Sequence, residues 1–204
     1  METLLTQPAP EEKKESFWKE LVKFILLAVL IVVPIRTFIA QPFIVSGASM
    51  DPTFWDGEYL IVDELSYRLG EPKRGEVVIF RYPQDPSKFF IKRLIGLPGE
   101  KLVIKSGEIT ITTAAGNEIS WKEPYVEEGR KNTYENITTT LGDNEYYVLG
   151  DNRTGSSDSR RWGPVPRNYI VGRPLVRLIP LSKISLFPGD FTSKPLQSEQ
   201  LLDK

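Results

Sequence analysis

An apolar stretch near the N-terminus places the strongest constraint on how this chain can fold. No residue from Phe24 to Ile35 carries a charge, and the surrounding sequence from Trp18 to Ala40 is largely apolar. A helix over residues 17–40 would be roughly 36 Å long at about 1.5 Å per residue, enough to cross a hydrocarbon core of roughly 30 Å. The stretch therefore predicts a single N-terminal transmembrane helix over 17–40.

A cleaved signal peptide is the alternative explanation of this stretch. Ala40 has the small side chain that precedes a cleavage point, but Phe38 is bulky where such sites need a small residue. We therefore favour an uncleaved anchor in the cell (inner or cytoplasmic) membrane. Only Arg36 follows the span closely, so the positive-inside rule predicts a cytoplasmic N-terminus and an outer catalytic domain. The basic residues before or early in the span are Lys13, Lys14, Lys19 and Lys23.

Beyond residue 40 the sequence changes to short β-rich runs separated by Gly, Pro, Asn or Asp. This spacing is typical of an antiparallel all-β domain, so the fold class is predicted to be mainly β. The runs are residues 59–62, 76–82, 89–95, 101–105, 108–112, 145–149 and 175–179. The predicted parts are a cytoplasmic tail (1–16), the anchor (17–40), an extracytoplasmic domain (41–190) with an inserted β-rich cap (101–147), and a flexible C-terminal tail (191–204).

Two amino acids are missing from the composition, and their absence removes several kinds of chemistry. The chain has no cysteine and no histidine, so disulfides, thiolate or histidine zinc sites and a Ser-His-Asp triad are excluded. A nucleophilic serine would need a lysine, a carboxylate or the terminal amine as its base. With 26 basic and 27 acidic residues, the balance of charge gives no reason to expect nucleic acid as a partner. No cofactor and no metal are expected.

A loop of small residues, Ile44 to Thr53, directly follows the apolar stretch. It contains Ser46 and Ser49, and Pro52 favours a turn. Such a loop can present a hydroxyl on a tight bend, open to an incoming carbonyl. Ser, Gly, Asp and Pro also favour ordinary turns at the end of a strand, so the loop alone supports both interpretations.

A single lysine, Lys92, lies in the run that leads to Gly96, where Arg93 is the only other charged residue between Phe89 and Ile95. Alternation along a strand places Phe90, Lys92 and Leu94 on one face. Most strand lysines face water. A lysine desolvated by apolar neighbours can instead lose its proton and act as a base.

Four motifs in one order give a family resemblance. They are Ser49-Met50-x-Pro52-Thr53, then Arg74 to Val78, then Lys92-Arg93-x-x-Gly-x-Pro-Gly, then Gly150 to Arg153 continuing through Ser156, Asp158 and Arg160 to Pro166. This series resembles the type I signal peptidases, which are membrane-anchored Ser/Lys proteases. It covers most of residues 38–180.

The resemblance implies a role for each matching residue. Ser49 would be the nucleophile and Lys92 the general base, with Ser156 holding the lysine amine by a hydrogen bond. Asp158 and Arg160 would support the loop beneath the site. Arg93 and Asp151 would form a structural ion pair.

One position departs from a common family pattern and puts the oxyanion hole in doubt. Many members have a serine two residues before the nucleophile, where its hydroxyl helps to bind the oxyanion. This chain has Gly47 there and Ser46 one residue earlier. The Ser49 backbone N–H would carry more of the stabilisation, with Ser46 or a water as the other donor.

The implied function is cleavage of signal peptides from exported preproteins through an acyl-enzyme. The preprotein would bind as an added β-strand. Shallow pockets for small side chains would be lined by Phe43, Val45, Met50, Phe54 and Ile91, although ordinary core packing explains the same residues. The partners are then preproteins and the lipid bilayer, where Phe54 and Trp55 would touch the lipid. The sequence leaves the oligomeric state open.

Two alternatives share some of these features. One is a self-cleaving Ser/Lys protease of the repressor type, which the apolar span argues against. The other is a non-catalytic, membrane-anchored β-domain that binds a partner, for which all the ordered motifs would have to be structural.

Overall fold

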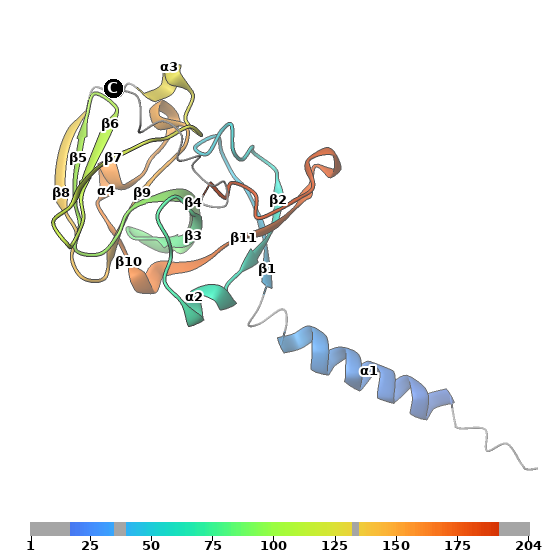
Figure 1. Ribbon diagram of the computed structural model, residues 1–204. Helices are drawn as coiled ribbons and strands as arrows, with labels where there is room; N and C mark the ends of the chain where they lie inside the picture. Colours follow the sequence, from blue (N-terminus) through green and yellow to red (C-terminus); the bar gives the residue numbers. More distant parts are fainter. Residues whose placement is uncertain (1–16, 35–39, 132–134, 192–204) are drawn as a thin grey trace, which may run out of the picture. The chain divides into compact units, whose positions relative to one another are not determined.

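In the computed structural model, residues 17–34, 40–131 and 135–191 are described. The chain divides into two compact units, Met1–Thr37 and Phe38–Lys204. The first contains helix α1 (Phe17–Pro34), and the second contains every strand of the described residues (Figure 1). The predicted tails over 1–16 and 191–204 lie outside the described residues, apart from Phe191.

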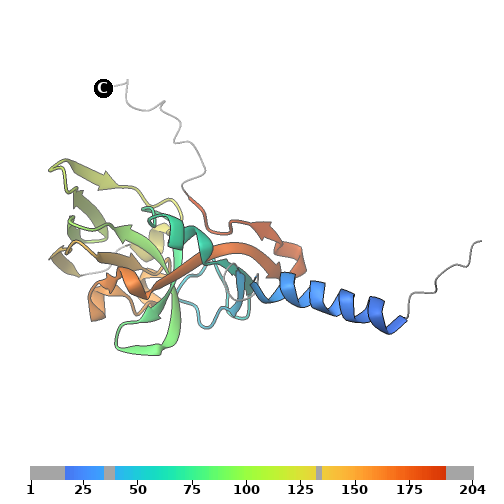
Figure 2. The ribbon, with the colours of Figure 1, turned by 90° about the horizontal axis from the view of Figure 1, so that it is seen from below.

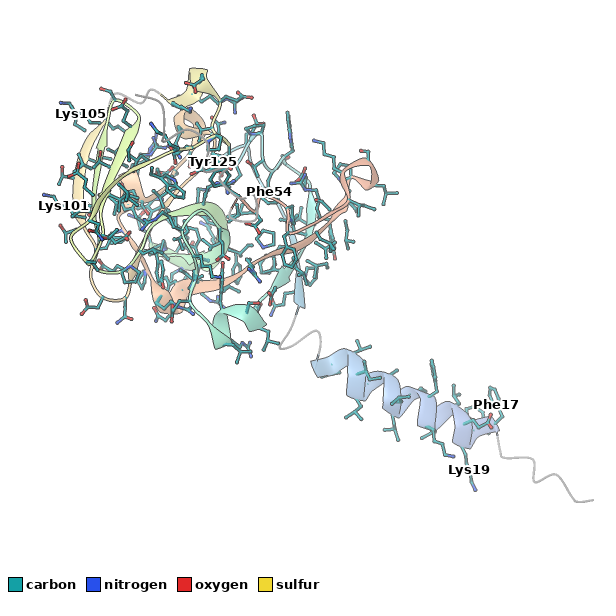
Figure 3. All side chains as sticks on the ribbon, in the orientation of Figure 1. Phe17, Lys19, Phe54, Lys101, Lys105 and Tyr125 are labelled. Carbon is teal, nitrogen blue, oxygen red and sulfur yellow. The ribbon has the colours of Figure 1, made fainter. Side chains whose placement is uncertain are left out.

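Helix α1 covers only part of the predicted span. Its first two turns carry Lys19, Glu20 and Lys23, and Phe17 and Lys19 project from it in Figure 3. Residues 35–39 of the predicted span lie outside the described residues, and Ala40 begins a strand instead of ending a helix. Within 17–34, 40–131 and 135–191, no helix combines the length and apolar content needed to cross a membrane.

The larger sheet holds eight antiparallel strands. Their order is β1 (Ala40–Ile44), β2 (Tyr59–Asp63), β11 (Ile170–Ile179), β3 (Val77–Tyr82), β4 (Asp85–Gly96), β9 (Glu145–Leu149) and β10 (Val165–Pro166), with β12 (Ser185–Leu186) paired to β11. Strand β11 lies in the middle of this order and is the long orange strand of Figure 2. It pairs with β2 along one part and β3 along another, with bulges between, so it joins the two halves of the sheet.

The larger sheet is curled. In the sheet order, three strands separate β1 from β4. The rings of Phe43 on β1 and Phe89 on β4 nevertheless meet edge to face, with centroids 5.3 Å apart. Bulges increase local twist and bending, which explains how the outer strand β1 reaches the far side. The curl creates a cleft between β1 and β4.

The smaller sheet has four strands in the order β7 (Glu118–Trp121), β6 (Glu108–Thr112), β5 (Lys101–Lys105) and β8 (Asn136–Thr140). Leu102 and Ile104 alternate with Lys101 and Lys105, so β5 buries one face and exposes the lysines. Figure 3 shows the two lysines on the outer side. Leu102, Ile104, Ile109 and Ile111 pack with residues of β4 and β9, which joins the two sheets through one core.

The remaining elements are short. They are α2 (Leu65–Leu69), α3 (Glu128–Lys131), α4 (Ser159–Trp162) and the 3₁₀ turns η2 (Arg153–Gly155), η3 (Arg167–Tyr169) and η4 (Leu181–Lys183).

The prediction of a mainly β, antiparallel fold is confirmed, and all seven predicted runs form strands. The seven runs did not include β1, β7, β8, β10 or β12, and they placed the start of β11 at residue 175 instead of 170. The division of this region into a catalytic part and an inserted cap over 101–147 stays a prediction.

Candidate active site

Ser49 lies in the loop that joins β1 to β2. These strands pair in antiparallel register up to Ile44 and Tyr59. The Val45 N–H donates to the Glu58 carbonyl at 2.9 Å, and the Gly57 N–H donates back to the Val45 carbonyl at 2.9 Å. The loop therefore leaves and re-enters the sheet at a fixed position, with Ser49 near its middle.

Side chains and backbone from residues 151 and 152 hold this loop in place. The Asn152 backbone N–H donates to the Ser49 carbonyl at 3.1 Å, and its side-chain amide donates to the Ala48 carbonyl at 3.0 Å. The Thr53 hydroxyl donates to Asp151 Oδ2 at 2.5 Å. The segment that follows β9 thus forms hydrogen bonds with the loop on both sides of Ser49.

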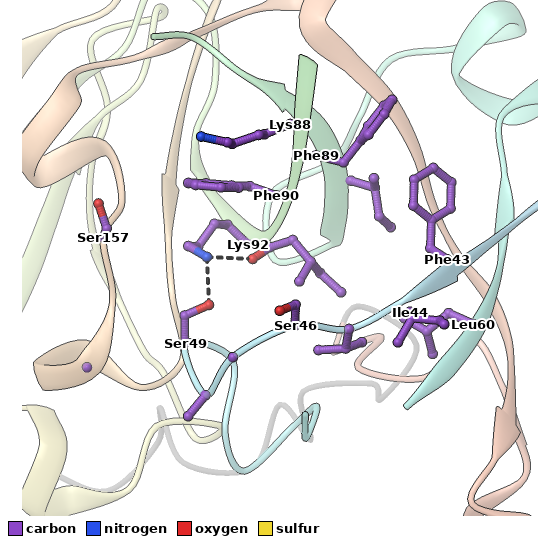
Figure 4. Close-up of a pocket in the computed structure, with 16 residues that line it drawn as sticks. Phe43, Ile44, Ser46, Ser49, Leu60, Lys88, Phe89, Phe90, Lys92 and Ser157 are labelled. Carbon is purple, nitrogen blue, oxygen red and sulfur yellow. Dashed lines mark hydrogen bonds between the residues drawn. The ribbon is translucent and has the colours of Figure 1, made fainter. Parts of the chain in front are cut away.

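Lys92 lies on β4, where it pairs with Val78 of β3. Its side chain is buried, with the residue only 4% exposed. The Lys92 amine donates to Ser49 Oγ at 2.7 Å and to the Ile91 carbonyl at 2.8 Å, as drawn in Figure 4. The Phe90 ring lies over the amine, with its centroid 5.3 Å from Nζ. The nucleophile and base predicted from the sequence are therefore in direct contact.

Burial lowers the pKa of the Lys92 amine to about 8, although the negative charges of Asp158 and Asp151 act in the opposite direction. The cause is desolvation, because an ammonium in a low-dielectric setting loses its hydration. At pH 7, about 10% of such an amine is neutral, against roughly 0.03% at the ordinary pKa. Burial thus increases the neutral fraction of this amine at pH 7 about 300-fold.

Arg93, the neighbour of Lys92, faces the other side of β4 and pairs with Asp151. Arg93 Nε and Nη2 donate to the two carboxylate oxygens at 2.9 and 2.6 Å, and both side chains are buried. The ring of Tyr125 lies 3.9 Å from the Arg93 guanidinium carbon. This bidentate pair links strand β4, which carries Lys92, to the segment that holds the loop of Ser49.

Asp158 and Arg160 form a second buried unit beneath the site. Asp158 accepts hydrogen bonds from Arg160 Nε and Nη2, each at 2.8 Å, and from the Gly150 N–H at 3.0 Å. Burial raises the pKa of the Asp158 carboxyl, but the hydrogen bonds and charge of Arg160 more than offset this, so the pKa lies below its ordinary value. Asp158 therefore stays ionised and braces the turn at Gly150.

Ser156 lies beside the site but does not hold the lysine amine in this structure. Its hydroxyl is buried and has no partner of ordinary hydrogen-bond geometry among the described residues, although it lies near enough to Asp158 to help lower that pKa. A Cβ at Gly150 would lie 2.2 Å from Ser156 Oγ and 2.5 Å from the Ser49 carbonyl oxygen. Ser156 and Ser49 thus approach each other across a position where only glycine fits.

Ser46 lines the cleft, with its hydroxyl on the side of Ser49 in Figure 4. The neighbouring Gly47 N–H is engaged elsewhere, because it donates to Asp56 Oδ1 at 2.7 Å. Gly47 has a φ of 85°, a conformation that glycine adopts without strain. The departure at residue 47 therefore fits the backbone of this loop.

The cleft between β1 and β4 has a volume of about 530 Å³. Three of the five predicted pocket residues line it: Phe43, Val45 and Ile91. Met50 and Phe54 do not, because both are fully buried in the small core beneath the loop. Figure 3 shows Phe54 inside the domain. The same burial keeps Phe54 from lipid, whereas Trp55 is 49% exposed.

The described residues also show contacts that sequence reasoning missed. Arg130 of α3 forms an ion pair with Asp51, and Glu123 pairs with the buried Arg153. These partners are 79 and 30 residues apart in the chain, so no local pattern marks them. Within the described ranges, no group of three or more acidic side chains is arranged to hold a metal ion.

Comparisons with known proteins place this chain in a family. The model of the family described as "Signal peptidase, peptidase S26" matches residues 18–179. A probable signal peptidase I-2 from Synechocystis is 37% identical over 91% of this chain and 84% of its own length. A signal peptidase I from Bacillus licheniformis is 35% identical over 88% of this chain and 98% of its own.

Among solved structures, a signal peptidase I from Enterococcus faecalis is 28% identical, covering 51% of this chain and 97% of that chain at a TM-score of 0.44. The family model and the two curated relatives extend over most of the sequence. They include the loop of Ser49, strand β4 and the segment around Gly150. This chain belongs to the signal peptidase family, peptidase S26, and is a serine endopeptidase.

Proposed function

We propose that this chain cleaves signal peptides from exported preproteins with Ser49 as nucleophile and Lys92 as general base. The observation that carries the proposal is the 2.7 Å contact between Ser49 Oγ and a buried lysine amine. No imidazole exists in the chain to do this work. A lysine with a pKa of about 8 is a competent base near neutral pH.

The reaction proceeds in two halves. Neutral Lys92 accepts the Ser49 proton as Oγ attacks the scissile carbonyl, and the new ammonium then protonates the leaving amine to give the acyl-enzyme. In the second half, the neutral amine takes a proton from water, the hydroxide attacks the ester carbonyl, and the proton returns to Ser49. The Ile91 carbonyl, which accepts from the Lys92 amine, keeps the amine in place through both halves.

We assign oxyanion stabilisation to the Ser49 N–H and the Ser46 hydroxyl. The Gly47 N–H is occupied by Asp56, which leaves Ser46 as the nearby side-chain donor that lines the cleft. One preorganised donor of this kind changes kcat by about 10²–10³ when removed.

Ser156 supports the base in this proposal. A buried hydroxyl without a partner costs roughly 1–3 kcal/mol, so it gains from any group that comes within reach. Ser156 Oγ already lies against the backbone at Gly150, close to the Ser49 carbonyl. When the Lys92 amine gives up its contact with Ser49 during acylation, the Ser156 hydroxyl becomes its next acceptor.

The preprotein binds as an added β-strand in the cleft. Strand β1 ends the sheet order, and residues 85–92 of β4 pair with β3 alone, so both strands offer a free edge toward the cleft. Phe43, Val45 and Ile91 then lie under alternate substrate residues. The edge-to-face contact of Phe43 and Phe89 narrows the cleft and favours small side chains.

The proposal includes membrane attachment through the segment that contains α1, a cytoplasmic N-terminus and the catalytic domain on the outer face. Its support is the apolar side chains exposed along α1. In the second unit, Trp55 contacts Lys183, whose amine lies 4.9 Å above the indole ring. Further apolar residues are exposed from the end of β11 to just after β12: Leu178, Ile179, Leu181, Ile184, Leu186 and Phe187. Carbonate extraction of membranes tests the anchor, which should resist release.

The decisive experiment is cleavage of a synthetic preprotein with small residues one and three positions before the cut, read by mass spectrometry. We expect one product from the wild type and none from Ser49→Ala or Lys92→Arg, because a guanidinium cannot lose its proton. Matched controls are Ser120→Ala and Lys101→Met, both exposed on the smaller sheet. Full activity in Lys92→Arg would rule out the proposed base.

A further inference from the structure

Arg130 reaches from α3 to the loop that carries Ser49. Its Nη1 donates to Asp51 Oδ2 at 2.9 Å and lies 3.3 Å from the Asp51 backbone carbonyl. Its Nε pairs at 3.0 Å with Glu127, the residue just before α3, and this pair orients the guanidinium. Asp51 follows Ser49 by two residues, so the contact acts close to the nucleophile.

This contact differs in origin from the other tethers of the loop. Asn152 holds Ala48 and Ser49, and Asp151 holds Thr53, both from the segment after β9, while Arg177 of β11 donates from Nη2 to the Thr53 carbonyl at 2.6 Å. Among the described residues, the hydrogen bonds to Asp51 from another part of the chain come from Arg130 and end at its carboxylate and carbonyl.

The segment that carries Arg130, residues 122–131, is itself firmly held, and we call it the α3 arm. Glu123 is buried and pairs with both Nη atoms of the buried Arg153. Tyr125 packs on Arg93, and its hydroxyl bridges Glu123 and the Trp121 indole N–H. The arm therefore gives Arg130 a rigid support. Arg153, the partner of Glu123, begins the turn that ends at Gly155, which lines the cleft.

We propose that Arg130 is a positioning residue that sets Ser49 Oγ against the Lys92 amine by holding Asp51. The inference rests on the proposed function and gives the α3 arm a part in it. The physical reason is geometric. The loop turns through Gly47 and Gly57, both at positive φ, so a charge-assisted hydrogen bond from outside the loop limits its movement. A shift of about 1 Å at a nucleophile can cost about 100-fold in rate.

The test is a cycle of variants in the full chain: Arg130→Ala, Arg130→Lys, Asp51→Asn, and the exchange of Arg130→Asp with Asp51→Arg. Arg130→Ala should lower kcat about tenfold with little change in KM, since the cleft residues are untouched. Arg130→Lys should recover part of the loss. The exchanged pair should be more active than either of its single variants.

The matched control is Lys131→Ala. Lys131 is the next residue of the same helix and pairs only with Glu128 among the contacts the described residues show, so its removal should leave kcat unchanged. Thermal unfolding of each variant separates loss of position from loss of fold. A wild-type kcat in Arg130→Ala, or equal losses in Lys131→Ala, would overturn the inference.

A second readout does not depend on the preprotein. Titration of the Lys92 amine by NMR should show a higher pKa in Arg130→Ala than in the wild type, because a displaced loop admits water to the amine. If the wild type cleaves no preprotein, the proposed function fails, and this titration still decides the role of Arg130: an unchanged Lys92 titration would count against it.

Discussion

The strand that carries the proposed base, Lys92, and the loop that carries the proposed nucleophile, Ser49, meet at one hydrogen bond but are held by different means. Lys92 is placed by the backbone ladder of β4, with β3 paired beside it and β9 pairing from Arg93 onward. Ser49 is placed by tethers from Asn152 and, two residues on, from Arg130. Regular pairing makes a position robust, whereas a loop depends on a few contacts. Substitutions at the tethers should therefore shift Ser49 more than substitutions at other residues of β4 shift Lys92, whereas replacing Lys92 itself removes the proposed base.

The largest effect should come from Lys92→Met, which removes the base and keeps the strand. Cleavage should fall at least about 10³-fold. The free energy of unfolding of this variant should instead exceed that of the wild type near pH 7. The reason is that the folded-state pKa of Lys92, about 8, lies below the ordinary 10.5, so burial disfavours its ammonium form. Below pH 8 the buried ammonium costs the wild type about 3 kcal/mol.

The pH dependence of the free energy of unfolding checks the direction of this predicted change in stability. As the pH rises from 8 to 10.5, the folded chain releases the Lys92 proton before the unfolded chain does, so wild-type stability should rise across this window. Lys92→Met should lack that rise and be more stable near pH 7. Denaturant unfolding at pH 7 and pH 10 measures both, and a Met variant that is less stable at pH 7 would contradict the prediction.

Asp151→Ala should destabilise both strand β4 and the loop of Ser49, because Asp151 contacts a residue of each. It leaves Arg93, which is 1% exposed, without its carboxylate, and it frees the Thr53 hydroxyl. Removing one partner of a buried ion pair costs about 3–5 kcal/mol. Chemical denaturation should show this loss, while Asp143→Ala, at an exposed turn, should change stability by less than about 0.5 kcal/mol.

Gly150→Ala tests how closely the two regions approach. The new methyl would lie 2.2 Å from Ser156 Oγ and 2.5 Å from the Ser49 carbonyl oxygen, so the loop must shift. We expect kcat/KM to fall about 100-fold. Gly129→Ala, where a methyl meets nothing within 4 Å, is the control. Equal activities in the two variants would show that the contact does not position Ser49.

The pH profile of cleavage should follow the titration of Lys92. Below its pKa of about 8, kcat/KM should rise about tenfold for each pH unit, because only the neutral amine accepts the Ser49 proton. Above pH 8 the rate should level. Initial rates between pH 5.5 and 9.5 measure this, and a profile that levels near pH 6 would assign the limiting ionisation to another group.

The smallest effect should come from Thr53→Val, which keeps the shape of the side chain and removes its hydrogen bond to Asp151. Hydrogen bonds to charged groups contribute about 1.5–3 kcal/mol, and the retained Arg93 pair limits the loss to the lower end. Cleavage should fall severalfold. Thr140→Val, exposed on β8, should behave as wild type in both assays.

Much of the fold could be predicted because its signals are local. Alternation in residues 101–105 and 108–112 marked β5 and β6, and turn residues marked their ends. Strand β8, Asn136–Thr140, was missed although it is rich in β-branched residues. Apart from Ile137 its side chains are polar, and none of the five is fully buried, so it depends on pairing with β5 more than on its own pattern.

The five pocket residues implied by the family resemblance differ in where they lie. Phe43, Val45 and Ile91 lie on strands or at their ends and line the cleft. Met50 and Phe54 lie in the loop after Ser49, where no period applies. The loop folds back over its own apolar side chains and buries them.

The sequence alone determined that any base for Ser49 had to be something other than histidine, and the ordered motifs singled out Lys92. Only the tertiary structure decided that the amine of this lysine is desolvated. Its burial depends on the ring of Phe90 and on the loop of Ser49, a residue 43 positions away in the sequence. The same holds for Arg130 and Asp51. Residue type is local information, whereas desolvation and ion pairing require partners that only the folded chain brings together.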